Sequence, residues 1–252
     1  SVRPASITPA ALDAFKRVHI FDSSSWDIDP KLKHVLPGSG GGASDANCKV
    51  QVGYEYKSGS LGFFALTEGI KPDRAYSNRL VDFAQKGDLM LTDLGYFKLS
   101  VFQQITAKGA YFLSKLLIGT TLLNADTSEK IDLRATLRSF VGNTLEMNVI
   151  MGNDKHPVPC RLIGFRATKQ IADTRRRKLR KEAKKKGRTP SKNHLALCDW
   201  TLFVTNAPSE MLPVTIVFSL YRLRWQIELI FKQLKSVLRI HSSHTAKEYR
   251  LK

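Results

Sequence analysis

The segment 221–235, YRLRWQIELIFKQLK, is the feature that most constrains how this chain can fold. At 100° per residue, Tyr221, Arg224, Glu228 and Lys235 fall within roughly 60° of one another on a helix. Apolar residues form a neighbouring stripe that must pack against other structure. The adjacent side then presents a carboxylate flanked by a phenol, a guanidinium and an ammonium. A simpler interpretation is an exposed i,i+4 salt bridge between Arg224 and Glu228, worth a few tenths of a kcal/mol.

Acidic residues also close two segments that have the composition of buried strands. The run VHIF leads into Asp22, and the run DLMLT leads into Asp93. Taken singly, Asp22 could form a turn at a strand end and Asp93, before Leu94 and Gly95, an Asx turn. Together with Glu228 they place one carboxylate on each of three separate segments, which points to a shared site.

The segments around these strands supply the rest of an α/β pattern. We predict a polar connection at 23–47, hairpin strands at 49–56 and 61–69, a helix at 74–86, and a helix broken at Gly109 over 99–116. From about residue 120 the chain becomes strand-like with turn residues between the strands. Within that part lies the run RRRKLRKEAKKKGRTPSKN at 175–193, whose composition predicts an exposed helix or a disordered arm.

The order of these segments resembles an RNase H-like nuclease fold. That resemblance predicts an α/β protein with a mixed sheet flanked by helices, interrupted by a β-rich insertion before the last helix. We expect residues 1–119 to form the first part of the core and 120–207 the insertion, with its basic arm at 175–193. Residues 208–252 would supply the closing helix.

The charge of the chain predicts a polyanionic partner. Forty Lys and Arg against 22 Asp and Glu give a formal charge of +18, which favours nucleic acid over a membrane surface. No apolar run approaches the ~20 residues of a membrane span, and no apolar signal sequence opens the chain. The three cysteines are far apart and form no CxxC pair, as in a cytosolic protein without a zinc site.

Asp22, Asp93 and Glu228 can converge only if the first and fourth strands lie side by side, as they do in an RNase H-like fold. Three carboxylates in one site repel one another unless a cation neutralises them. Oxygen ligands predict Mg²⁺, with Mn²⁺ as the alternative. Two such ions about 3.5–4 Å apart can activate a water or a 3′-hydroxyl against a phosphodiester. The basic and phenolic groups on the helical face of Glu228 would then hold phosphates.

The spacing Tyr221, Arg224, Glu228, Lys235 matches the Y-(2)-R-(3)-E-(6)-K signature, and the chain resembles the IS4 family of DDE transposases. The contexts VHIFDSSS and LTDLGYF, the insertion and the WTLFVTNAP stretch are also similar to that family. The resemblance implies metal-dependent cleavage at the ends of an insertion sequence, followed by strand transfer into target DNA. It further implies double-stranded DNA as partner, a homodimer in a synaptic complex, and a cytoplasmic, nucleoid-associated location in a prokaryote.

The resemblance also bears on two tryptophans. Some members of the family cut through a DNA hairpin intermediate in which a tryptophan holds a flipped base. The resemblance would put that residue at Trp200, which lies 28 positions before Glu228, while Trp225 lies within the signature. Packing in the core or at an interface is the alternative for both tryptophans.

Members of this family extend further at both ends than the present chain does. Only 21 residues precede Asp22, and 17 follow Lys235. The resemblance therefore predicts that the chain is truncated at both ends.

Two other functions remain open at this level. Composition alone is equally consistent with a non-catalytic nucleic-acid-binding protein that uses the basic arm, in particular Arg175, Arg176, Arg177 and Lys178. A different RNase H-like nuclease would share the three acids without needing the signature spacing.

Overall fold

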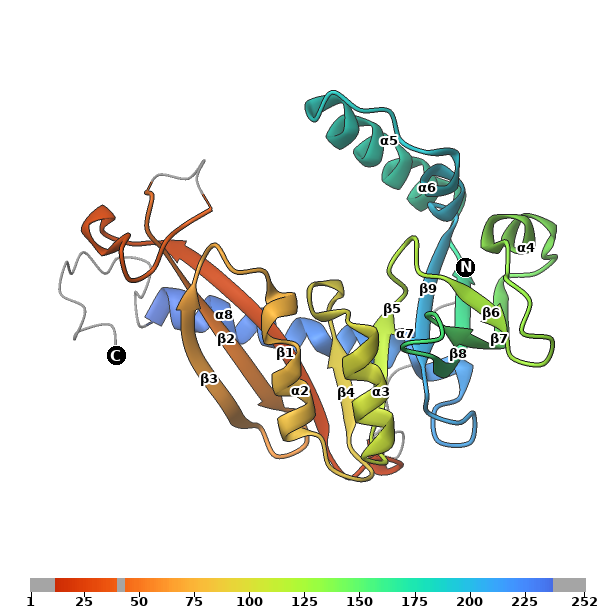
Figure 1. Ribbon diagram of the computed structural model, residues 1–252, viewed down its shortest axis with the longest axis horizontal. Helices are drawn as coiled ribbons and strands as arrows, with labels where there is room; N and C mark the ends of the chain where they lie inside the picture. Colours follow the sequence, from red (N-terminus) through yellow and green to blue (C-terminus); the bar gives the residue numbers. More distant parts are fainter. Residues whose placement is uncertain (1–11, 40–43, 238–252) are drawn as a thin grey trace.

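The computed structural model describes residues 12–39 and 44–237 of the 252-residue chain (Figure 1). The strands are β1 (Val18–Asp27), β2 (Asn47–Glu55), β3 (Ser60–Glu68), β4 (Leu89–Thr92), β5 (Tyr111–Lys115), β6 (Leu122–Asn124), β7 (Thr144–Met151), β8 (Val158–Arg166) and β9 (Trp200–Thr205). The α-helices are α2 (Asn78–Phe83), α3 (Leu99–Ala107), α4 (Leu133–Ser139), α5 (Lys169–Lys185), α6 (Lys192–Leu197), α7 (Val214–Arg222) and α8 (Gln226–Val237). Short 3-10 helices are η1 (Pro30–Leu32), η2 (Asp73–Tyr76), η3 (Leu94–Tyr96) and η4 (Leu223–Trp225).

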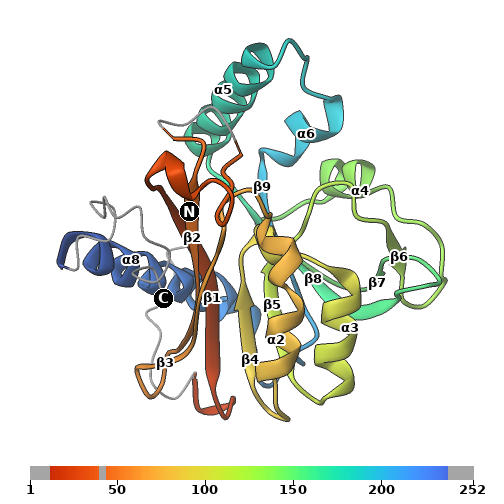
Figure 2. The same ribbon diagram turned by 60° about the vertical axis from the view of Figure 1, so that its left-hand side comes forward.

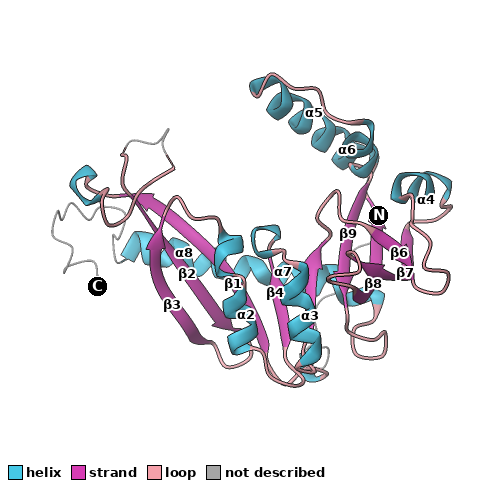
Figure 3. Ribbon diagram, viewed as in Figure 1, coloured by secondary structure: helices cyan, strands magenta, loops and turns pink. Residues whose placement is uncertain are grey.

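All the named strands join one mixed sheet in the order β3-β2-β1-β4-β5-β9-β8-β7-β6 (Figure 3). The pairs β1–β4 and β4–β5 are parallel, and the other neighbouring pairs are antiparallel. The first and fourth strands therefore lie side by side, as the sequence predicts. The mixed sheet with helices on both faces confirms the RNase H-like α/β fold.

The two faces of the sheet are buried by different helices. Phe21 and Met90 pack with α2 and α3 on one face, whereas Ile20 and Leu91 pack with α7 and α8 on the other. This alternation follows from the period of two along each strand, and it explains why these central strands are apolar on both sides. In the turned view of Figure 2, α8 runs along the face opposite α2 and α3.

The first strand is longer than the sequence indicates. We expected VHIF to end at Asp22 and a polar connection to begin at Ser23, but β1 continues to Asp27. Residues beyond Asp22 remain in register with β2, ending in the pair Asp27↔Asn47. The prediction failed because this half of β1 is hydrogen-bonded to β2 while its side chains are mostly polar and only partly buried.

A second correction concerns residues 99–116, which we expected to be one broken helix. The helix α3 ends at Ala107, Gly109 adopts a left-handed φ of +70°, and residues 111–115 form the central strand β5. Short apolar runs do not distinguish a buried helix from a buried strand. Pairing with β4 and β9 on either side decides the outcome here.

The region 120–207, predicted as a β-rich insertion, contains the helices α4, α5 and α6 as well as the strands β6 to β9, and it extends the sheet of the core. Its strands β6 to β9 attach through β9, which pairs antiparallel with β5. The basic run predicted as an exposed helix or arm forms most of α5, which begins at Lys169 with the Thr168 side chain capping its N-terminus. Figure 1 shows α5 projecting away from the edge of the sheet.

The predicted closing helix is divided into two. A 3-10 turn, η4, separates α7 from α8, so the segment that carries Tyr221 and Glu228 is not a single regular α-helix. Leu238 and the residues after it lie outside the described part of the chain. Within the described residues, no helix is long and apolar enough to cross a membrane.

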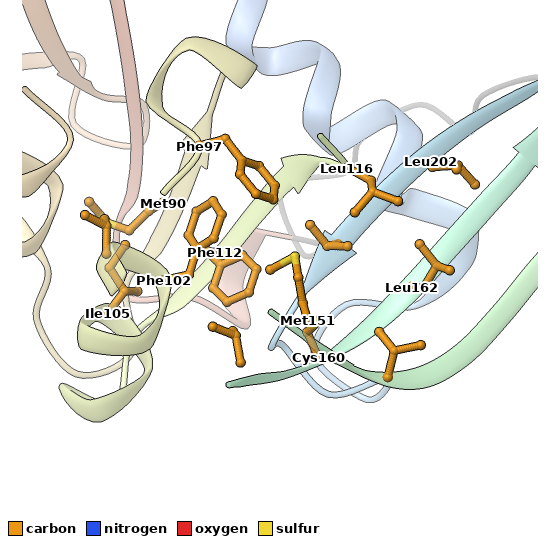
Figure 4. Close-up of a cluster of buried hydrophobic side chains, with 14 of the residues drawn as sticks. Met90, Phe97, Phe102, Ile105, Phe112, Leu116, Met151, Cys160, Leu162 and Leu202 are labelled. Atoms are coloured by element: carbon orange, nitrogen blue, oxygen red, sulfur yellow. The ribbon is translucent and has the colours of Figure 1, made fainter. Parts of the chain in front are cut away.

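An aromatic cluster packs α3 against β5 in the core (Figure 4). Phe102 stacks on Phe112 with ring centroids 4.4 Å apart and meets Phe97 edge-on at 5.1 Å.

We predict that Phe102→Ala lowers the free energy of unfolding by about 3–5 kcal/mol, since a fully buried ring is replaced by a cavity. Phe64→Ala, at a ring that is 53% exposed, should change it by less than about 1 kcal/mol. Urea denaturation measures both, and equal losses would contradict this account of the core.

Candidate active site

Asp22 and Asp93 lie next to each other at one edge of the sheet. The parallel pairing of β1 with β4 ends at Phe21↔Thr92, and each aspartate is the next residue of its segment. Their side chains continue the alternation of Ile20 and Leu91 and so face α7 and α8. The backbone N–H of Ser23 donates to Asp22 Oδ1 at 2.8 Å.

Arg224 brings the three predicted carboxylates together. Its Nη1 lies 2.7 Å from Asp22 Oδ2, its Nη2 lies 3.2 Å from Glu228 Oε1, and its Nε lies 4.0 Å from Asp93 Oδ1. The side chain of Arg224 is only 11% exposed. All three acids therefore surround one guanidinium at the sheet edge, which matches the convergence expected from the sequence. The i,i+4 pair of Arg224 and Glu228 exists too, but as one part of this larger cluster.

Tyr221 is placed differently from our expectation. Its side chain is buried, and its hydroxyl donates to the Thr92 carbonyl oxygen at 3.1 Å. Tyr221 lies on α7 and Arg224 lies three residues later on the 3-10 turn η4, a spacing at which side chains point to nearly the same side. The Tyr221 hydroxyl contacts the end of β4, whereas the Arg224 guanidinium contacts the carboxylates. Tyr221 thus fastens α7 to the end of β4, next to Asp93, and does not present its hydroxyl to an incoming phosphate.

An open groove of about 600 Å³ runs between β1 and α8 beside the carboxylates. Its lining combines acidic, basic and hydroxyl groups with one aromatic ring: Asp22, Ser23, Ser24, Glu228, Phe231, Lys232, Lys235 and Ser236. Lys235 Nζ donates to the Ser25 carbonyl oxygen at 3.4 Å, which holds this ammonium at the wall of the groove. An extended anionic chain in the groove would meet these ammonium groups within reach of the carboxylates.

Comparison with known proteins shows which family the chain matches. The family described as "Transposase DDE domain" matches residues 13–251, nearly the whole chain. The chain belongs to this family.

Curated relatives agree with the assignment. The chain is 31% identical over 261 residues to the transposase for insertion sequence element IS231F of Bacillus thuringiensis subsp. israelensis, covering 97% of this chain and 55% of the relative. It is 32% identical over 243 residues to the transposase for insertion sequence element IS1151 of Clostridium perfringens, covering 90% and 51%. The chain thus spans about half the length of the curated relatives it matches. A crystal structure of Ciona intestinalis endonuclease V with DNA aligns over 87% of the chain at 12% identity, with a TM-score of 0.32.

Burial sets the electrostatics of this DDE domain. It raises the pKa of Asp22 to about 6, although the hydrogen bond from Ser23 and the charge of Arg224 act in the opposite direction. Burial opposes the charge of Arg224, yet Asp22, Asp93 and the other neighbouring acids raise its pKa above the ordinary value. Arg224 Nε is buried without a hydrogen-bond partner in the described residues. The guanidinium of Arg224 therefore stays charged, whereas the Asp22 carboxyl, with a pKa of about 6, takes up a proton in mildly acidic solution.

The two tryptophans occupy opposite environments. Trp200 is buried, with the Arg166 guanidinium 4.5 Å above its ring and Phe140 packed edge-on at 5.9 Å. The geometry thus supports the packing interpretation for Trp200, because these neighbours cover its ring. Trp225 is 55% exposed and lies beside the Arg222 guanidinium at 5.6 Å. Of the two rings, that of Trp225 is far the more exposed.

The basic arm is exposed along most of its length, as predicted, but two of its arginines are structural. Arg175 donates to the carbonyl oxygens of Cys198 and Trp200 and to the Thr201 hydroxyl. Arg176 pairs with Asp173 and Asp199. These contacts attach the base of α5 to β9 and its preceding turn. Arg177 and Lys178 are exposed, with weaker local partners on the same helix: the Thr174 hydroxyl for Arg177 and Glu182 for Lys178.

Sequence reasoning missed two residues beside the site. Lys115, at the end of β5, lies 5.6 Å above the Tyr221 ring; burial lowers its pKa even though Asp93 attracts its charge. Lys115 could have been found as the residue that ends a strand parallel to β4. We missed it because we predicted residues 99–116 as a helix.

Asp73 is the other missed residue, and it links the segments that follow the two aspartates. Its Oδ1 accepts from the Ser23 hydroxyl at 2.7 Å and from Gln51 Nε2 at 3.2 Å. Its Oδ2 lies so close to Gly95 that a Cβ there would come within 3.0 Å of it. No local pattern in the sequence indicates this role, because every partner of Asp73 is distant along the chain.

The donor set suits a hard divalent cation in its chemistry, since it consists of carboxylate oxygens. Within the described ranges, however, no three acidic, histidine or cysteine side chains are close enough together to hold a metal ion by themselves. Arg224 lies between the three carboxyl groups and sets their spacing. A divalent ion would therefore find the right atoms here, at distances that the guanidinium now determines.

The raised pKa of Asp22 predicts a pH dependence of stability. The folded-state pKa is about 6 and the unfolded value 3.8, so the folded state binds the extra proton between these pH values. This favours folding at low pH and is lost as the pH rises through 6. The stability of the wild type relative to Asp22→Asn should therefore fall by about 1–3 kcal/mol from pH 4 to pH 7 in EDTA. Urea denaturation measures it, with Asp82→Asn in an exposed pair as control; the same trend in both variants would contradict the assignment.

Proposed function

We propose that the chain is the catalytic region of an IS4-type DDE transposase that cleaves DNA at the ends of an insertion sequence and joins the 3′-hydroxyl to target DNA. The single observation that carries this proposal is the convergence of Asp22, Asp93 and Glu228 on Arg224 beside an open groove whose wall also carries lysines. Membership of the transposase DDE domain family and the similarity to insertion-sequence transposases support it.

In this proposal Asp22, Asp93 and Glu228 would hold divalent metal, Mg²⁺ before Mn²⁺. When bound, such ions supply Lewis-acid activation of the attacking oxygen and stabilise the leaving oxygen. The chain itself orients the DNA. For Arg224 to bind a phosphate, one of its Nη donors would turn from Asp22 or Glu228 to the DNA. Lys235 and Lys232 line the groove along which the strand would run. Tyr221 attaches α7 to the end of β4, and α7 leads through η4 into α8, which carries Glu228.

The partners we propose are double-stranded DNA, both as element ends and as target, and a second copy of the protein in the synaptic complex. The net charge of +18 supports DNA binding and a nucleoid-associated location. The exposed cations of α5 would contact the backbone without reading its sequence. A purely DNA-binding protein remains the alternative, and it gives no reason for three acids to surround one arginine at a groove.

Glu228→Gln separates catalysis from binding. It keeps the shape of the side chain and removes the charge, so Mg²⁺-dependent DNA cleavage should fall by several orders of magnitude. Metal-free DNA affinity should stay the same or rise, since a negative charge next to the phosphate is gone. Arg224→Ala should instead weaken metal-free DNA binding by about 1.5–3 kcal/mol. Cleavage assays and fluorescence anisotropy measure these effects.

Glu210→Gln provides a matched control for this test, because Glu210 is an exposed acid in the loop before α7. It should leave both cleavage and affinity unchanged. The assigned roles are wrong if Glu228→Gln lowers metal-free DNA affinity as much as Arg224→Ala does. Loss of cleavage in the Glu210 variant as well would show that the assay reports net charge and not the site.

The basic helix α5 gives a second test, in which its arginines divide into two kinds. Arg177→Ala with Lys178→Ala should weaken binding to any duplex alike and reduce the slope of log K against log salt by about 0.9 for each lost phosphate contact. Arg175→Ala should mainly lower the melting temperature, because three hydrogen bonds to β9 and its flank are lost. An unchanged salt slope in the double variant would show that these exposed cations are only solvated.

A further inference from the structure

A pocket of about 320 Å³ lies between α4, the end of β8 and α6, away from the carboxylate cluster. It is lined by Arg134, Leu137, Arg138, Arg166, Ala196, Asp199 and Trp200. We propose that this arginine pocket binds a phosphate group of the DNA backbone, as an anchoring site separate from the catalytic groove. The choice of DNA as the ligand rests on the proposed function. The pocket as an anion site rests on the contacts of its own arginines.

Arg166 is held in place by the protein. Its Nε donates to the Gly142 carbonyl oxygen at 2.8 Å, its Nη2 donates to the Phe140 carbonyl oxygen at 2.6 Å, and its guanidinium lies 4.5 Å from the centre of the Trp200 ring. No acceptor for its Nη1 is present in the described part of the chain. A guanidinium fixed on one side with donors left on the other is preorganised for an anion, because little side-chain freedom is lost on binding.

Arg134 and Arg138 lie one helical turn apart on α4 and both line the pocket. Within residues 12–39 and 44–237, neither guanidinium has an ion pair or a side-chain hydrogen bond. Two like charges at i and i+4 on a helix repel each other. Placing them together with Arg166 around one cavity is therefore unfavourable until an anion enters, and a phosphate oxygen accepts well from the planar fork of arginine.

The one acid in the pocket does not cancel this charge. Asp199 pairs with the Arg176 guanidinium, which in turn bonds Asp173. Arg176 thus holds the Asp199 carboxylate from the α5 side while sharing its own charge with Asp173. The lining of the pocket keeps a net positive charge, because three arginines face one carboxylate.

The shape of the pocket favours backbone phosphate over a nucleobase. Arg166 covers one face of the Trp200 ring and Phe140 packs against it edge-on, so the ring offers no free stacking surface. A volume of about 320 Å³ admits a phosphate group with its sugar, whereas a duplex must lie across the opening. The ligand would thus be held by charge and without sequence preference.

The arginine pocket is also connected to the catalytic site along the edge of the sheet. Trp200 separates it from a neighbouring cavity lined by Leu94, Lys115 and Arg175, and Leu94 follows Asp93 directly. Basic groups therefore continue from the carboxylates through Lys115 and Arg175 to the arginines of α4. In Figure 1, α4 and α6 lie close together where β9 begins. One DNA duplex crossing this edge would contact both sites.

The test compares the duplex DNA affinity of two double variants, each of which removes two positive charges. Arg134→Gln with Arg138→Gln should weaken binding of a random-sequence duplex by about tenfold or more at moderate salt. The slope of log K against log salt should drop by about 0.9 for each lost phosphate contact. Lys86→Gln with Lys155→Gln removes two exposed lysines that do not line the pocket, and should leave the slope unchanged. Fluorescence anisotropy across several salt concentrations measures both.

A chemical footprint provides an independent readout. Duplex DNA should protect Arg134 and Arg138 from phenylglyoxal, as read by mass spectrometry, while free inorganic phosphate at the same phosphate concentration should protect them less. Equal modification with and without the duplex would overturn the proposal, and so would a double arginine variant that behaves like the lysine control. If the wild type binds no duplex at all, the proposed function is wrong and the phosphate site is wrong with it. If the wild type binds duplex and the double arginine variant binds it with the same affinity and salt slope, only the phosphate site is wrong. Neither arginine of α4 has a structural partner in the described residues, so an unchanged melting temperature is expected for their double variant.

Discussion

The parallel pairing of β1 with β4 is the constraint on which the rest of this structure depends. These strands are separated in sequence by the β2–β3 hairpin and α2, yet their pairing through Phe21↔Thr92 brings Asp22 and Asp93 to the same edge. Parallel neighbours need such a crossover, and the sheet must be covered on both faces to bury the apolar strands that result. The helices α7 and α8 cover one face and thereby bring Glu228 to the same place.

Arg224 then balances the charge that this topology concentrates. Three carboxylates at one edge would repel one another, and a buried Asp22 is costly unless an opposite charge lies close by. A guanidinium can meet all three because its donors point in different directions from one plane. Arg224 lies on the 3-10 turn η4 between α7 and α8, and the nearby Tyr221 hydroxyl attaches α7 to the end of β4 through the Thr92 carbonyl oxygen. The same basic character continues along the edge of the sheet through Lys115 to α5 and the arginines of α4.

Much of this could be predicted from the sequence where the signal is local. The hairpin strands, the buried runs that lead into Asp22 and Asp93, the strands after residue 140 and the helical periodicity around Glu228 all appear as patterns over a few residues. The errors occurred where contacts between distant segments decide the structure. Strand pairing decides β1 beyond Asp22 and β5 in a run that looks helical, and the last helix is divided where it packs on the sheet. The roles of Tyr221 and Arg175 were misjudged for the same reason, since their hydrogen-bond partners, Thr92 and the flank of β9, are distant in the sequence.

The sequence by itself determined which residue types were available: three acids on separate segments, a basic helical face, and a charge that selects a polyanion. Only the tertiary structure decided which of these groups meet. Asp73 lies against Gly95 and Ser23, Arg224 lies among three acids, and Trp200 lies beneath Arg166 because strands and helices from remote parts of the chain pack together there. Periodicity assigns a residue to a face, whereas contact depends on which face of another element lies opposite, and that is settled by burying the whole core at once.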